Sequence, residues 1–230
     1  MATRLTLTAQ KSPGPTGSTP KTWTLRQRNK RHHMTDRFLD KVYAVSGAEA
    51  TRDLYDAWSA SYDAEVSENG YATPSRCADA LAQAIEDRSK PILDFGCGTG
   101  LSGLALRLSG FTTIDGIDLS AEMLSQAEAK GVYRSLRQVD ADAPLTDTKD
   151  YAAITAIGVI GAGAAPLSVL DTLFNALGQS GLLCFSFNDH TLEDPAFEAR
   201  VTDLVASGKA RLLQREYGPH LPKLDLNSAV

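Results

Sequence analysis

A strand-like segment that runs into three alternating glycines is the feature of this sequence most suited to chemistry. Residues 92–100 read ILDFGCGTG, and the residues that follow have the apolar spacing of a helix. Glycines at such a turn adopt conformations that a Cβ would forbid and let the backbone pass close to a ligand. In doubly wound sheets, ligands bind in the crevice at the carboxyl ends of the strands. The pattern therefore predicts a ligand-binding turn rather than a plain connection.

The charge beside the turn indicates which ligand it takes. Gly98, Gly100 and Gly103 satisfy the GxGxxG pattern of dinucleotide sites, and Asp118 follows Gly98 at the spacing such sites use. Asp94, however, ends the strand just before the turn. A carboxylate there repels a pyrophosphate, whereas it attracts the sulfonium and ammonium groups of S-adenosylmethionine. The residues favour S-adenosylmethionine over NAD, and this argument requires Asp94 to face the ligand.

Two further carboxylates suit an adenosine group. Asp118 ends the second strand, where it can accept hydrogen bonds from both ribose hydroxyls of a nucleoside. Asp140 follows the third strand and could accept from the adenine amine, with the backbone at Ala141 beside the ring; a solvated loop aspartate is the alternative. The three aspartates end successive strands, which strengthens the joint interpretation.

These residues require an alternation of strands and helices to bring them together. From Thr35 onward strand-like and helical segments alternate, the pattern of a parallel sheet with helices on both faces. We expect an α/β fold, a Rossmann-like doubly wound and mostly parallel sheet of six to seven strands. The expected helices include residues 49–66, 73–87, 101–110, 121–130, 165–180 and 195–207; the expected strands lie within residues 91–95, 112–118, 133–140, 151–159, 181–187 and 210–217.

Three motifs carry a resemblance to a known family. The segments DFGCGTG, GIDLS and VDADAPL resemble successive cofactor motifs of class I S-adenosylmethionine-dependent methyltransferases, over about residues 91–189. YDAWSASYD at 55–63, residues 103–133 and AIGVIGAG are similar to the methyltransferase-like protein 27 group, also called the Williams-Beuren syndrome region methyltransferases. In that group the methyl acceptor is not settled.

The resemblance implies a role for each site residue. Gly96, Gly98 and Gly100 would line the methionyl part, Asp94 would lie near its amino group, and Asp118 and Asp140 would take the ribose and the adenine. Tyr55, Trp58 and Tyr62 would form a lid helix over the cofactor, although core packing explains the same spacing. The candidate cofactor-binding residues are Tyr55, Tyr62, Asp94, Gly96, Cys97, Gly98, Gly100, Asp118, Leu119, Asp140 and Ala141.

Methyl transfer from a sulfonium needs mainly alignment and exclusion of water, and a general base only when the acceptor holds a proton. His190, beside Asp189, is the candidate catalytic base; a surface histidine is the alternative, and His220 lies after the sixth strand. We expect no metal, because the fourth strand ends without a carboxylate.

The acceptor site is expected between residues 158–164, the FNDH turn and the lid helix. The segment IGVIGAGAAP is small and apolar, which favours a small, partly hydrophobic acceptor. Residues 35–230 carry a net charge of -12, so we expect no nucleic-acid partner. The oligomeric state stays open.

Composition sets the remaining expectations for the 230 residues. Three cysteines without ligand spacing favour a reducing compartment, so we expect a cytoplasmic protein with neither disulfides nor a structural zinc site. The longest apolar run falls short of the roughly 20 residues that span a membrane.

The domain expectation has three parts: a disordered basic tail over residues 1–34, a helical lid segment over 35–90 and the catalytic core over 91–230. The tail holds seven Lys or Arg and no acidic residue. It suits a transit peptide or a nucleic-acid-binding arm, but we favour Met34 as the true start. Residues 227–230 are expected to form at most a stub of a seventh, antiparallel strand.

Two rival functions stay open at this point. One is a nicotinamide-dependent oxidoreductase of the same fold, which Asp94 disfavours. The other is a protein that binds the nucleoside cofactor without transferring a group, which the weak case for a base favours.

Overall fold

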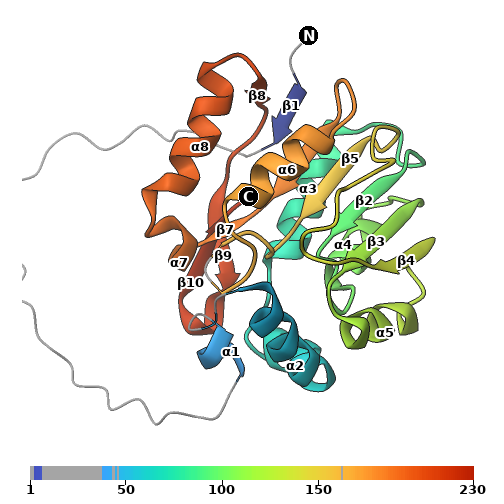
Figure 1. Cartoon of the computed structure of the whole chain (residues 1–230), viewed down its shortest axis with the longest axis vertical. Coiled ribbons are helices and arrows are strands. Elements are labelled where there is room, and N and C mark those ends of the chain that lie inside the picture. Colours follow the sequence, from blue (N-terminus) through green and yellow to red (C-terminus); the bar gives the residue numbers. More distant parts are fainter. Residues whose placement is uncertain (1–2, 7–37, 43–44, 46, 162) are drawn as a thin grey trace, which may run out of the picture.

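The computed structural model describes residues 3–6, 38–42, 45, 47–161 and 163–230. Its main sheet has the strand order β4-β3-β2-β5-β6-β1-β8, with every pairing parallel (Figure 1). The α/β doubly wound fold is thereby confirmed. The strands are β1 Thr3–Thr6, β2 Ile92–Phe95, β3 Ile114–Asp118, β4 Ser135–Gln138, β5 Ala153–Ala156, β6 Leu182–Phe185 and β8 Ala210–Leu212.

Helices cover both faces of this sheet. Adjacent residues of its central strands point to opposite faces, so each of these strands packs against helices on both sides. Ile92 and Ala153 pack with helices α3 and α4, whereas Leu93 and Ile154 pack with α6 and α8. The strands are therefore apolar throughout rather than alternating. The helices are α1 Phe38–Lys41, α2 Ala48–Glu68, α3 Thr73–Ala84, α4 Leu101–Leu108, α5 Ala121–Ala129, α6 Ser168–Ala176, α7 Asp189–Leu192 and α8 Pro195–Ala206.

The amino-terminal segment differs from expectation at one place. Residues 3–6 form β1, which pairs in parallel with β6 on one side and with β8 on the other. The expectation of a wholly disordered tail is therefore wrong for these four residues. The edges of β6 and β8 offer unpaired backbone N–H and C=O groups, and the composition of the tail does not reveal that it can pair with them. The rest of residues 1–34 lies outside the described residues.

A second, three-stranded sheet has the order β7-β10-β9, made of β7 Phe187–Asn188, β9 Tyr217–Leu221 and β10 Leu226–Ala229. Strand β10 runs antiparallel to both neighbours, and Ser228 pairs with Asn188. Residues 226–229 are thus an antiparallel strand rather than a stub, although they pair outside the main sheet. Arg76 of α3 holds this sheet through hydrogen bonds to the carbonyls of Pro219, Ser228 and Glu216.

Within the described part of the chain, none of the helices combines the length and the apolar character needed to cross a membrane.

Candidate functional site

The glycine turn after β2 has the backbone that the sequence predicts. Gly96, Gly98 and Gly100 have φ values of 67°, 52° and 92°, the left-handed region that side chains with a Cβ rarely adopt. A Cβ on Gly96 would lie 2.5 Å from Val159 Cγ2, so the segment after β5 presses on the turn. A Cβ on Gly98, in contrast, would meet no atom within 4 Å. The turn is thus packed against Val159 at Gly96 and open at its middle glycine, Gly98.

Asp118 joins the end of β3 to this turn. Its Oδ2 accepts a hydrogen bond of 2.8 Å from Gly98 N, and its Oδ1 accepts one of 3.0 Å from Ser120 N. Burial raises the pKa of Asp118, while these backbone donors act in the opposite direction. The carboxylate therefore lies at the open glycine, as a ribose-binding residue would require.

Asp94 does not face an open cleft, contrary to the premise of the charge argument. Its side chain is fully buried beneath the turn. Three hydroxyls donate to it: Ser102 Oγ at 2.6 Å and Tyr133 OH at 2.8 Å to Oδ2, and Thr155 Oγ1 at 2.8 Å to Oδ1. Burial raises its pKa, and the three hydrogen bonds oppose that shift. Asp94 thus ties β2 to α4 and β5, and its carboxylate is closed off from solvent.

Tyr133 is a site residue that the sequence did not reveal. Its ring lies between α4 and β3, where Cβ atoms added to Gly103 and Gly116 would come within 2.3 Å and 3.0 Å of it. Gly103 N donates to the Tyr133 hydroxyl at 3.1 Å. Gly103, the last glycine of the dinucleotide-like pattern, is therefore needed for this tyrosine rather than for a phosphate.

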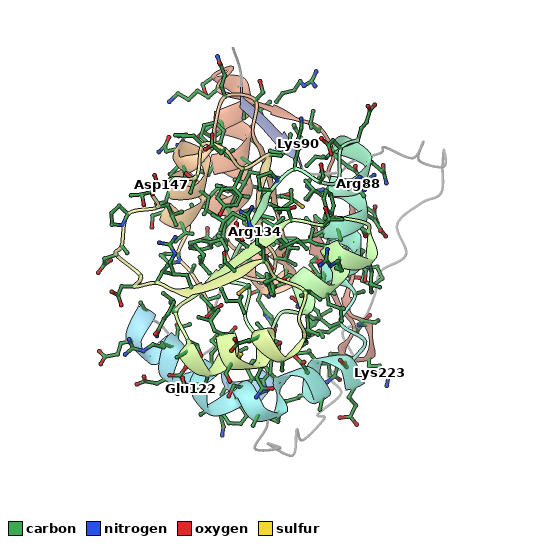
Figure 2. All side chains as sticks on the ribbon, turned by 90° about the vertical axis from the view of Figure 1, so that its right-hand side faces the viewer. Arg88, Lys90, Glu122, Arg134, Asp147 and Lys223 are labelled. Atoms are coloured by element: carbon green, nitrogen blue, oxygen red, sulfur yellow. The ribbon has the colours of Figure 1, made fainter. Side chains whose placement is uncertain are left out.

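Helix α2 lies against the glycine turn and α5, as a lid would. Thr99 Oγ1 of the turn donates a 2.5 Å hydrogen bond to Asp63 Oδ1 of α2. Lys130, just after α5, lies 2.6 Å from Asp63 Oδ2 and also donates to Thr99 O at 2.6 Å. In Figure 2, α2 crosses beneath α5 at the foot of the molecule. We call these three residues, Asp63, Thr99 and Lys130, the latch.

The aromatic residues of α2 divide between core and site. Trp58 is 2 % exposed and packs with Val42, Val66 and Leu221, so it has the core role that was the alternative to a lid. Tyr62 packs on Trp58 with ring centroids 4.6 Å apart, and Tyr55 stacks on the same indole. The pKa of Tyr62 is raised well above its usual value, first by burial and then by neighbours that include Asp118. The surroundings of Tyr62 therefore include Asp118 of the site.

The remaining cofactor candidates have different surroundings. Cys97 is buried, and its Sγ would lie 2.9 Å from a Cβ on Gly116, so only its backbone belongs to the turn. Burial raises the pKa of its thiol. Leu119 is partly buried and its carbonyl accepts from Gln138. Asp140 and Ala141 are exposed beyond β4.

The FNDH segment has a structural role. Asn188 caps α7 by accepting from Thr191 N at 3.0 Å. Asp189 accepts from Tyr217 OH at 2.6 Å and from Asn227 N at 2.8 Å, which fixes the second sheet. His190 lies partly exposed, 3.7 Å from Glu193 one turn along. Both carboxylate oxygens of Asp189 are therefore engaged by the second sheet, and His190 Nδ1 lies near Glu193.

Of the three segments expected to bind the acceptor, residues 158–164 and the FNDH turn line one cavity, whereas no residue of the lid helix α2 lines it. Gly158, Ile160, Gly161 and Ala164 line a cavity of about 20 Å³ with residues of the second sheet and of the β6–α7 segment. This is room for about one water molecule. His220, 7 % exposed, also lines it, and its Nδ1 lies 2.8 Å from Thr73 Oγ1. Burial lowers the pKa of His220 to about 4, so the ring is neutral at neutral pH.

Comparison of the sequence with known proteins matches it to one enzyme family. A family model described as a methyltransferase domain matches residues 70–224. Methyltransferase-like protein 27 of Homo sapiens is 34% identical over 162 residues, which cover 67% of this chain and 66% of the human protein. A protein of Geobacillus sp. (strain WCH70) named as a methyltransferase is 26% identical over 156 residues, covering 62% and 63%. The matches thus span just under two thirds of both relatives.

Solved structures agree at the level of the fold. The [4+2]-cyclase SpnF has a TM-score of 0.50 at 20% identity, covering 63% of this chain and 61% of that one. The ribosomal protein L11 methylase of Lactobacillus delbrueckii subsp. bulgaricus has a TM-score of 0.50 at 17% identity, covering 70% and 78%. Since one of the two is named for a different reaction, the shared fold does not define the chemistry.

Proposed function

The chain belongs to the methyltransferase domain family, and on this premise we propose that it transfers the methyl group of S-adenosylmethionine to a small, partly apolar acceptor. The observation that carries the proposal is the arrangement of the open glycine turn, Asp118 and helix α2. These elements surround one point at the carboxyl edge of the sheet.

The residues of this site fit the proposed cofactor. The space above Gly98 accommodates a ligand lying on the backbone, and a side chain there would fill it. Asp118 presents carboxylate oxygens at the same point for hydroxyl donors. Gly98 N–H already donates to Asp118, so it is not free for a phosphate oxygen, which argues against a dinucleotide. The negative charge that favours a cationic ligand thus comes from Asp118 rather than from the covered Asp94.

Bound S-adenosylmethionine supplies a methyl group on a sulfonium, whose sulfur is a good leaving group. The protein residues then have the tasks of orientation and dehydration. The latch holds α2 over the turn, and Tyr62 adds an apolar ring on the same side. Asp94 and its three hydroxyl partners keep the turn rigid by linking it to α4 and β5.

The acceptor enters from the side of residues 158–164 under this proposal. Val159 contacts the turn at Gly96, so this segment lies next to the cofactor site. The cavity behind it is too small for any organic acceptor, and the segment must move to admit one. The small, apolar residues of the 158–164 segment and the net charge of -12 over residues 35–230 favour a small molecule over a polynucleotide.

The role of His190 as a base stays a proposal; its imidazole lies partly exposed beside Glu193, just after α7. An acceptor without a dissociable proton would need no base at all. The alternative of a protein that binds the cofactor without turnover remains the second candidate, and the absence of an identified base favours it.

Calorimetry tests the proposal first, with S-adenosylmethionine, S-adenosylhomocysteine and NADH titrated into the full chain. We expect both sulfur ligands to bind and NADH to bind at least a hundredfold more weakly; a preference for NADH would overturn the proposal. Transfer of a labelled methyl group to components of a cell extract, followed by mass spectrometry, then separates an enzyme from a binding protein. Label in a small product supports the enzyme, and none in any product supports the alternative.

A further inference from the structure

Asp56 lies on the face of α2 that meets the glycine turn. It precedes Asp63 by seven residues, two helical turns or roughly 10 Å along the axis, so both side chains leave the helix on the same side. The bond from Thr99 to Asp63 fixes that side toward the turn. Asp56 therefore leaves α2 on the side of the glycine turn, about two helical turns before the latch.

The carboxylate of Asp56 has a buried oxygen that needs a donor. Oδ1 is shielded from solvent, and none of the described residues donates a hydrogen bond to it. Other buried carboxylates of this protein are well supplied. Asp94 has three hydroxyl donors, and Asp115 has Arg134, Ser135 and Tyr151. A buried acceptor without a partner is costly, and a hydroxyl donated by a bound ligand would remove that cost.

The neighbour of Asp56 in the site is Asp118. Burial is the main cause of the raised pKa of Asp118, and the negative charge of Asp56 raises it further. Asp56 of α2 thus lies within electrostatic reach of Asp118, the carboxylate that accepts from Gly98 N at the open glycine. Their repulsion is relieved when donor hydrogens lie between them.

We propose that Asp56 and Asp118 form a two-carboxylate clamp for the vicinal hydroxyls of the cofactor ribose, with one hydroxyl donating to each. This inference rests on the proposed function and adds to it a specificity residue on the lid. The clamp links ribose binding to the position of α2, because a ligand held by Asp118 alone would leave Asp56 unpaired.

The test compares Asp56→Asn with Asp53→Asn in the full chain. Asp53 lies on the same helix but is exposed, with 69% of its side-chain surface accessible. Calorimetry uses S-adenosylhomocysteine and its 2′-deoxy and 3′-deoxy analogues. We expect Asp56→Asn to weaken binding of the parent ligand about tenfold, as for loss of a charged hydrogen bond. For one deoxy analogue the two proteins should bind equally, because the missing hydroxyl is the partner of Asp56.

The outcomes separate this inference from the proposed function. If the unsubstituted protein binds neither sulfur ligand, the proposed function fails and the clamp with it. If it binds but Asp56→Asn binds equally well, only the clamp is overturned. An equal loss with all three ligands also overturns it, because Asp56 then meets something other than a hydroxyl. The apo Asp56→Asn protein should melt at the same or a higher temperature; a lower one would assign Asp56 a structural role instead.

Discussion

The Tyr133 hydroxyl donates a 2.8 Å hydrogen bond to Asp94 Oδ2 across 39 residues of sequence. It completes a set of three hydroxyl donors around a carboxylate that is fully buried beneath the glycine turn. The relationship explains why Asp94 supports the turn and why Gly103 must lack a side chain. Tyr133 and Asp94 therefore affect the glycine turn indirectly, by holding the backbone beneath it in place.

Replacing Tyr133 with Phe tests this support. The ring still fills its space, but Asp94 loses one of three donors and Gly103 N–H loses its acceptor. We expect the free energy of unfolding to fall by about 2 kcal/mol, as measured by urea denaturation. Tyr217→Phe is the matched control, because Tyr217 donates to Asp189 at the exposed surface. A loss as large for Tyr217→Phe would contradict the special role of Tyr133.

Replacing Gly98 with Ala separates binding from backbone strain. Gly98 and Gly131 both have positive φ, 52° and 61°, and a Cβ on either meets no atom within 4 Å. Each alanine variant should therefore lose about 1 to 2 kcal/mol of stability for the left-handed backbone. Only Gly98→Ala should also weaken S-adenosylhomocysteine binding, by at least tenfold in calorimetry, because its Cβ enters the ligand space. Equal binding by the two variants would place the cofactor elsewhere.

Breaking the latch should speed the loss of bound ligand. Asp63→Ala removes the partner of Thr99 and Lys130, so α2 is held less firmly over the turn. Since Asp63 is partly exposed, we expect a stability change of about 1 kcal/mol or less. The dissociation rate of S-adenosylhomocysteine in stopped-flow experiments should rise several-fold. Asp171→Ala, which breaks the pair with Arg200 on the far face, should leave that rate unchanged; a similar rise there would refute the latch.

His220 should make the protein sensitive to mild acid. Burial lowers its pKa to about 4, below the ordinary value of 6.5, so the unfolded chain binds the proton more readily. This contribution to stability is fully present above pH 6.5 and is lost as the pH falls toward 4, by up to about 3 kcal/mol. Urea denaturation between pH 7 and 4.5 should show the loss, and His220→Asn should flatten it. His190→Asn is the control, and an equal effect from it would show that His220 is not the group responsible.

Much of the fold followed from local pattern. The apolar strands, the glycine turn and the helices between the strands all depend on neighbouring residues. The pairing of β1 and the second sheet did not follow, because both depend on backbone partners far away in the chain. In the site, sequence located the turn and Asp118. It missed Tyr133 and the latch, whose only signals were a tyrosine after a helix and an aspartate within the YDAWSASYD segment.

The sequence by itself determined the order of the elements from α2 to β6, the conformation of the glycine turn and the family, because each depends on residue types at short and fixed spacing. Tertiary structure alone decided which carboxylate lies beneath the turn and which lies at the open glycine. Asp94 and Asp118 look alike along the chain, yet packing surrounds one with three hydroxyls beneath the turn and leaves the other at the open glycine. Burial and the direction of a side chain depend on distant elements coming together, and no local pattern encodes them.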